Sequence, residues 1–129
     1  MKGLDTPVLL ALLEGNPRAV ARVRKWRGEE LATTEANLLE MAAIAARSPA
    51  RHRTARLTAL GRLRRRLSVL PIGSQAVEEA SRHLAAHPGD GSLLSVVIAA
   101  AFEAGGCDEI LTDEPAQFGT KWRVRCSKL

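Results

Sequence analysis

Five short apolar runs, separated by stretches with helical periodicity, constrain the fold of this chain most strongly. The runs lie at the N-terminus and near Leu31, Ser68, Ile110 and Trp122. Between them, apolar residues recur at intervals of three and four, which is the spacing of one helix face. Strands that alternate with helices are typical of a parallel sheet covered by helices. We therefore expect an α/β sandwich with a parallel sheet.

The length and composition indicate one water-soluble domain. The 129 residues contain no repeat or low-complexity linker, so we expect a single domain spanning residues 1–129. No apolar run approaches the roughly 20 residues of a membrane-spanning helix, and the start lacks the apolar segment of a secretion signal. We expect a cytoplasmic protein without a membrane partner. Cys107 and Cys126 match no metal-ligand spacing and are expected to be core or free thiols.

Positive charge is concentrated in one segment of the chain. The net charge is +5, and the segment from Arg47 to Arg66 contains eight arginines and no acidic residue. Such a segment either binds a polyanion or an acidic partner, or forms the solvated face of a helix. Both interpretations stay open from the charge pattern alone.

Acidic residues occur where the expected strands end. Asp5 follows the first strand, and Pro7 fits the first turn of the next helix, which Thr6 is expected to cap. Asp113 and Glu114 directly follow the strand at residues 110–112. Because the carboxyl ends of parallel strands share one edge of the sheet, we expect these carboxylates to converge there.

Two further acids complete the candidate set. Glu40 borders the buried stripe of the third helix, one turn after Asn37, and Asp90 precedes the apolar helix that begins near Leu93. Clustered carboxylates repel one another unless a cation neutralises them, and hard oxygen ligands suit Mg²⁺ or Mn²⁺. For each acid alone, a capping or surface role is the alternative.

Three segments together resemble the PIN-domain family. They are Leu4-Asp5-Thr6 with the leucine-rich helix after it, Leu31 to Glu40, and the late segment from Ile98 to Phe118. The resemblance covers essentially the whole chain, whose length is similar to that of the toxin subunit of VapBC toxin–antitoxin pairs. Order and spacing carry this resemblance, since no single motif is specific.

The resemblance implies a three-layer α/β/α fold and a Mg²⁺- or Mn²⁺-dependent endoribonuclease. In that family, acids matching Asp5 and Glu40, with one or two late acids, hold the metal, and a hydroxyl residue matching Thr6 orients the first acid or a water. Asp113 and Glu114 both remain candidates for the last acid. The resemblance also implies an RNA substrate, an antitoxin protein as partner and a homodimer, with the basic segment serving RNA or antitoxin binding.

One position departs from the family pattern. The run Ser95-Val96-Val97-Ile98-Ala99-Ala100 matches a hexad that normally opens with an acid, and here it opens with Ser95. Asp90 replaces that acid only if the chain around Gly89 and Gly91 is not helical. The alternative function is therefore a PIN-like interaction or RNA-binding protein with a weakened or inactive metal site.

Overall fold

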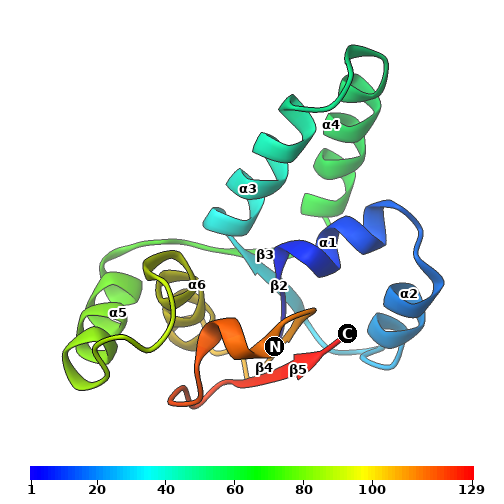
Figure 1. The fold of residues 1–129 in the computed structure, drawn as a ribbon. Coiled ribbons are helices and arrows are strands. Elements are labelled where there is room, and N and C mark those ends of the chain that lie inside the picture. Colours follow the sequence, from blue (N-terminus) through cyan, green and yellow to red (C-terminus); the bar gives the residue numbers. More distant parts are fainter.

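A five-stranded, all-parallel sheet lies between two layers of helices (Figure 1). The computed structural model describes residues 1–129. The strands are β1 (Lys2–Leu4), β2 (Leu31–Thr34), β3 (Ser68–Leu70), β4 (Glu109–Thr112) and β5 (Arg125–Lys128), in the order β3-β2-β1-β4-β5. The helices are α1 (Thr6–Leu13), α2 (Pro17–Arg24), α3 (Glu35–Ala46), α4 (Ala50–Arg64), α5 (Ser74–Ala86) and α6 (Leu93–Ala104), with a 3-10 turn η1 (Pro115–Phe118). The expected three-layer α/β/α architecture is confirmed.

The first strand is the centre of the sheet. β1 pairs with β2 on one side and with β4 on the other, so that Gly3 lies opposite both Ala32 and Ile110. The backbone N–H of Asp5 donates to the carbonyl oxygen of Leu111 at 3.0 Å and extends this pairing by one residue. Asp5 therefore leaves the sheet at the middle of its carboxyl edge.

The two faces of the sheet have separate cores. On the α6 face, Ile98 and Phe102 pack with Ile110 of β4. Gly3 lies against this helix so closely that a Cβ atom at position 3 would be 2.7 Å from the Phe102 ring. On the other face, Leu4 packs with residues of α1, α3 and α4. The core on both faces is aliphatic apart from a few aromatic rings.

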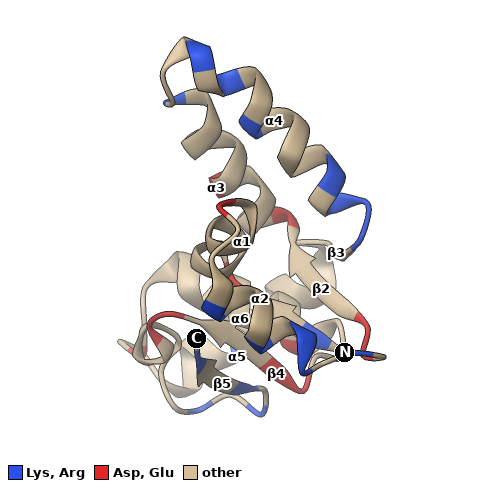
Figure 2. Ribbon diagram, turned by 90° about the vertical axis from the view of Figure 1, so that its right-hand side faces the viewer, with Lys and Arg blue, Asp and Glu red and all other residues tan.

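Helices α3 and α4 form a hairpin that projects from the body of the protein (Figure 1). Arginines are spread along α4 and its connection to β3, which Figure 2 shows in blue. Leu60 of α4 is buried, whereas Arg64, Arg65 and Arg66 are exposed. The basic segment is thus the outer surface of this hairpin.

Some local expectations differ from the structure. Thr6 does not cap α1, because Asp5 is the N-cap residue, its side chain makes no capping bond, and Thr6 lies in the first turn. The last strand begins at Arg125, three residues after Trp122, because the backbone N–H groups of Arg123 and Val124 donate to the Glu103 carboxylate instead of to β4. Both cysteines are free thiols, as expected. No helix has the length and apolarity that crossing a membrane requires.

Candidate functional site

Asp5 is a buried carboxylate held by three side chains. Only 3% of the residue is exposed. Its Oδ1 atom accepts a hydrogen bond from Asn37 Nδ2 at 2.9 Å, and its Oδ2 atom accepts from Thr112 Oγ1 at 2.7 Å and from Gln117 Nε2 at 2.9 Å. Burial raises the pKa of the Asp5 carboxyl, while these donors and the Thr6 backbone N–H oppose that rise. Asp5 is therefore oriented by neutral hydrogen-bond donors, and it forms no salt bridge.

Asn37 connects the start of α3 to this carboxylate. The helix begins with a capping box, in which Asn37 N donates to Thr34 Oγ1 and the Thr34 backbone N–H donates to Asn37 Oδ1. The same Asn37 side chain donates from Nδ2 to Asp5 and, at 3.0 Å, to Thr6 Oγ1. Asn37 is fully buried, so its role is to fix two elements of the site, rather than to contribute a contact at the rim.

Glu40 joins the site through the hydroxyl of Thr6. Thr6 Oγ1 donates to Glu40 Oε1 at 3.3 Å, and this places the carboxylate on the same side of α3 as Asn37. Burial raises the pKa of Glu40, and the negative charge of Asp5 raises it further, against the hydrogen bond from Thr6. The two predicted acids therefore lie close enough for the charge of one to act on the other.

A pocket of about 320 Å³ opens at the carboxyl edge of the sheet beside these acids. Asp113, which follows β4, lines it together with Asp5 and Glu40. Ser95 also lines it, and its hydroxyl oxygen accepts a hydrogen bond from the α6 N-cap residue Ser92 at 2.9 Å. The structure thus brings three of the five predicted metal-ligand candidates, with Thr6 and Ser95, to one pocket.

The other two predicted acids are not among the residues that line this pocket. Asp90 Oδ2 lies 3.0 Å from His83 Nε2, and the Asp90 carboxylate packs against Gly119. Glu114 is exposed, and its backbone N–H donates to Thr112 Oγ1 at 3.4 Å. The chain around Asp90 is indeed not helical, because Gly89 and Gly91 both have positive φ angles, but the turn directs the side chain to His83.

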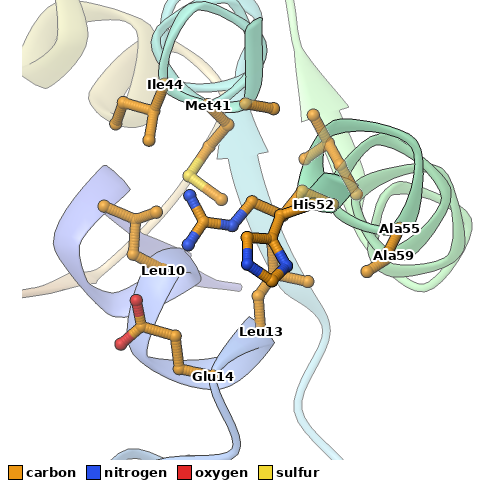
Figure 3. Close-up of a pocket in the computed structure, with 11 residues that line it drawn as sticks. Leu10, Leu13, Glu14, Met41, Ile44, His52, Ala55 and Ala59 are labelled. Atoms are coloured by element: carbon orange, nitrogen blue, oxygen red, sulfur yellow. The ribbon is translucent and has the colours of Figure 1, made fainter. Parts of the chain in front are cut away.

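A second, more apolar groove lies between α1, α3 and α4 (Figure 3). Its volume is about 430 Å³, and Met41 and Ile44 of α3 face Leu10 of α1 across it. Glu14 lies at one end, and His52 is contributed by α4. Leu10 lines both this groove and the carboxylate pocket, so the two depressions adjoin.

The order of these elements and acids agrees with a known family. The PIN domain profile matches residues 3–117 of the chain. The chain belongs to the PIN-domain family. Comparison of this PIN domain with curated protein sequences gives no significant match.

Solved structures with the same fold include several toxin–antitoxin complexes. VapBC2 from Rickettsia felis, bound to a promoter DNA fragment, matches with a TM-score of 0.83 and 11% identity, covering 99% of this chain and 98% of that chain. DNA-bound VapBC from Salmonella typhimurium matches with a TM-score of 0.81 and 18% identity over 98% and 96%. VapC20 of Mycobacterium tuberculosis, a toxin that cleaves the sarcin–ricin loop, matches with a TM-score of 0.61 and 20% identity over 85% and 87%. At these identities the similarity demonstrates the fold of the PIN domain.

The chemistry of the pocket in this PIN domain fits a divalent cation. Carboxylates of Asp5, Glu40 and Asp113 and the hydroxyl of Thr6 are hard oxygen donors, which Mg²⁺ and Mn²⁺ prefer. A cation would also offset the repulsion that raises the pKa of Glu40. In the present side-chain arrangement, no three Asp, Glu, His or Cys side chains are close enough together to hold one ion. Mg²⁺ commonly keeps several waters in such sites, so fewer direct protein ligands suffice.

Two residues of the site were missed from sequence. Thr112 is the last residue of β4, and its hydroxyl is fully buried beside Asp5. Its position at the carboxyl end of a strand indicates, from sequence alone, that it lies near the carboxylates. Gln117 lies in η1, and no sequence pattern indicates that its amide turns back to Asp5.

Proposed function

We propose that this PIN-domain protein is a divalent-metal-dependent endoribonuclease and the toxin of a VapC-type toxin–antitoxin pair. The observation that carries the proposal is the meeting of Asp5, Glu40 and Asp113 at one pocket on the carboxyl edge of the sheet. Its substrate is RNA, and Mg²⁺ or Mn²⁺ is its cofactor. The VapBC structures with the same fold support the assignment to a toxin.

Each pocket residue has a defined task in this proposal. Asp5 and Asp113 hold the cation by their carboxylates, and the donors around Asp5 keep its oxygens in a fixed orientation. Glu40, on the neighbouring helix α3, contacts the same cation by its carboxylate. Thr6 positions Glu40 through its hydroxyl. When bound, the cation supplies positive charge at the scissile phosphate and lowers the pKa of water.

Two features of the α3–α4 hairpin are the proposed partner-binding surfaces: the apolar groove and the exposed arginines. The groove between α1, α3 and α4 combines an apolar floor with Arg56 and His52, and this suits an amphipathic, acidic segment of an antitoxin. The exposed arginines near the end of α4 suit RNA phosphates. A homodimer and a cytoplasmic location complete the proposal.

One observation favours a second candidate function. Ser95 lines the pocket at the position where the family pattern has an acid, and Asp90 is hydrogen-bonded to His83 outside it. A pocket with fewer carboxylates would bind a cation more weakly. The alternative is therefore an RNA-binding or protein-binding PIN domain with an inactive site.

The decisive experiment combines cleavage with metal binding. Purified protein is incubated with a mixed RNA pool and Mn²⁺ over a range of pH, beside the Asp5→Asn variant, and thermal unfolding is recorded with and without Mn²⁺. The enzyme proposal expects cleavage and a Mn²⁺-dependent rise in Tm for the native sequence, with both lost in Asp5→Asn. Intact RNA at every pH, with no Tm shift, would support the inactive alternative.

A further inference from the structure

Gln117 donates a hydrogen bond to the acid that anchors the proposed cation site. Its Nε2 atom lies 2.9 Å from Asp5 Oδ2 and 3.1 Å from Thr112 Oγ1. The side chain also lines the pocket shared by Glu40 and Asp113. Neither family resemblance nor sequence pattern gives this residue a role.

The hydrogen bond uses an electron pair that a cation needs. A carboxylate oxygen has about two acceptor positions in the plane of the group. On Asp5 Oδ2, one receives the Thr112 hydroxyl at 2.7 Å and the other receives the Gln117 amide at 2.9 Å. On Oδ1, Asn37 takes one position at 2.9 Å. A divalent cation that binds Oδ2 must therefore displace one of its two donors, since an N–H or O–H hydrogen and a cation repel each other.

Of these donors, Gln117 is the one that can leave. Thr112 and Asn37 are both 0% exposed, and each belongs to a regular element, β4 and α3 respectively. Asn37 is additionally fixed by its own bonds to Thr34. Gln117 is only partly buried and belongs to the single 3-10 turn of η1. Rotation of its side chain toward solvent breaks two hydrogen bonds and leaves the helix and sheet intact.

We propose that the cation binds Asp5 through Oδ2, where the Gln117 amide occupies its position, so that this hydrogen bond and a cation on Oδ2 exclude each other. This inference rests on the proposed function, because it concerns the regulation of cation binding at that site. Gln117 acts through Asp5 and is therefore a positioning residue. It keeps the buried carboxylate hydrogen-bonded in the metal-free protein and sets the cation concentration at which the site fills.

The first test is the affinity for Mn²⁺ alone, measured by titration calorimetry on the full chain. Gln117→Met keeps the length of the side chain and removes its N–H donors. Since a hydrogen bond to a charged group contributes about as much free energy as a tenfold change in an equilibrium constant, we expect roughly tenfold tighter Mn²⁺ binding. The control is Gln75→Met, the same substitution at the other glutamine of the chain, which is exposed on α5. It should bind like the native sequence.

The second measurement follows the amide directly. In a proton–nitrogen correlation spectrum, the side-chain amide pair of Gln117 is identified by its absence in Gln117→Met. Titration with Mg²⁺, which is diamagnetic, should move this pair to the position of a solvent-exposed glutamine, while the Gln75 pair stays unchanged. Thermal unfolding confirms that each variant is folded.

The possible outcomes separate this inference from the proposed function. Unchanged or weaker Mn²⁺ binding by Gln117→Met, an unmoved Gln117 amide, or no Mn²⁺ binding by any variant would each overturn the inference. RNA cleavage by the native protein together with an unchanged affinity in Gln117→Met removes the inference alone. Tighter binding in Gln117→Met together with intact RNA supports the inference and contradicts the ribonuclease function.

Discussion

Asp90 hydrogen-bonds to His83, with 3.0 Å between Oδ2 and Nε2, and does not line the carboxylate pocket. His83 is buried and stacks on Trp122, with ring centroids 3.8 Å apart and planes within 6° of parallel. Asp90 also lies against Gly119, where any Cβ atom would overlap its carboxylate. The acid thus joins the α5–α6 connection to the turn after η1.

Substitution of Asp90 tests whether this role is structural. We expect Asp90→Ala to lower the free energy of unfolding by about 1–3 kcal/mol, because it leaves the buried ring of His83 without its partner. Mn²⁺ affinity should stay unchanged. Urea unfolding and Mn²⁺ calorimetry measure the two effects, and Asp113→Ala is the comparison that should weaken Mn²⁺ binding. A loss of affinity in Asp90→Ala as large as that in Asp113→Ala would make Asp90 a ligand.

Glu109 is expected to make the fold sensitive to acid. It is 3% exposed and accepts hydrogen bonds from Arg22, Arg125 and Ser127 at 3.2, 2.9 and 2.6 Å. Burial acts to raise the pKa of Glu109, but the bonds from Ser127 and Arg125, with the charges of Arg125 and Lys2, outweigh it and hold the pKa below its ordinary value. Because the pKa of Glu109 is lower in the folded than in the unfolded chain, the carboxylate stabilises the fold at pH values above the unfolded pKa of about 4.3. That stabilisation is lost as the pH falls through the pKa of the folded state.

The Glu109→Gln variant tests whether the charge of Glu109 stabilises the fold at neutral pH. At pH 7 it should be less stable by about 1–3 kcal/mol, since a neutral amide loses the charged hydrogen bonds from Arg22 and Arg125. Between pH 5 and about pH 3, its stability should change less with pH than that of the native sequence. Urea unfolding at a series of pH values measures both curves. Parallel curves over this interval would show that Glu109 does not contribute to the acid sensitivity.

The two thiols are expected to report on unfolding. Burial raises the pKa of Cys107 to about 11 and that of Cys126 to about 11, and the negative charge of Asp5 adds to the second shift. At pH 8 only about one thiol in a thousand would then be the reactive thiolate. Ellman's reagent should therefore modify neither thiol rapidly in the native protein and both in urea. Rapid modification of Cys126 in buffer would mean that β5 opens locally.

The arginines at the end of α4 are expected to contact RNA phosphates. Reversing Arg64 and Arg65 to glutamate should weaken RNA binding and reduce its salt dependence, by about 0.7 in the logarithmic slope for each lost contact with a single strand. Fluorescence anisotropy at several salt concentrations measures the slope. Reversing Arg82 and Lys121, two exposed residues outside α4, changes the net charge equally and serves as control. Equal slopes for the two double variants would mean that α4 makes no specific contact.

The position of the carboxylate pocket could be predicted from the sequence because the pocket lies where the parallel strands end. Asp5 and Asp113 follow neighbouring parallel strands, so the shared edge brings them together. Glu40 could be predicted because it follows Asn37 by three residues, a spacing that puts both side chains on the same side of a helix. The order of the strands and helices along the chain was therefore sufficient to predict that these three acids meet.

Other contacts depend on turns whose path the sequence does not specify. Gln117 reaches Asp5 because η1 bends back over the sheet edge. Asp90 meets His83 because two glycines with positive φ angles, Gly89 and Gly91, flank it. In both cases the conformation of a short irregular segment determines which residue the side chain contacts, and this conformation cannot be predicted from helical or strand periodicity.

The close approach of Gly3 to Phe102 links the pocket to the core on the α6 face of the sheet. β1 lies nearer to α6 than any side chain at position 3 would permit. From Gly3 the chain reaches Asp5 in two residues, and the same helix carries Ser95 and Ile98 into the pocket. The contact between Gly3 and Phe102 therefore helps to set the distance between β1 and α6, and these two elements position Asp5 and Ser95 at the pocket. A larger residue at position 3 would therefore be expected to separate Asp5 from Ser95 without changing any residue that lines the pocket.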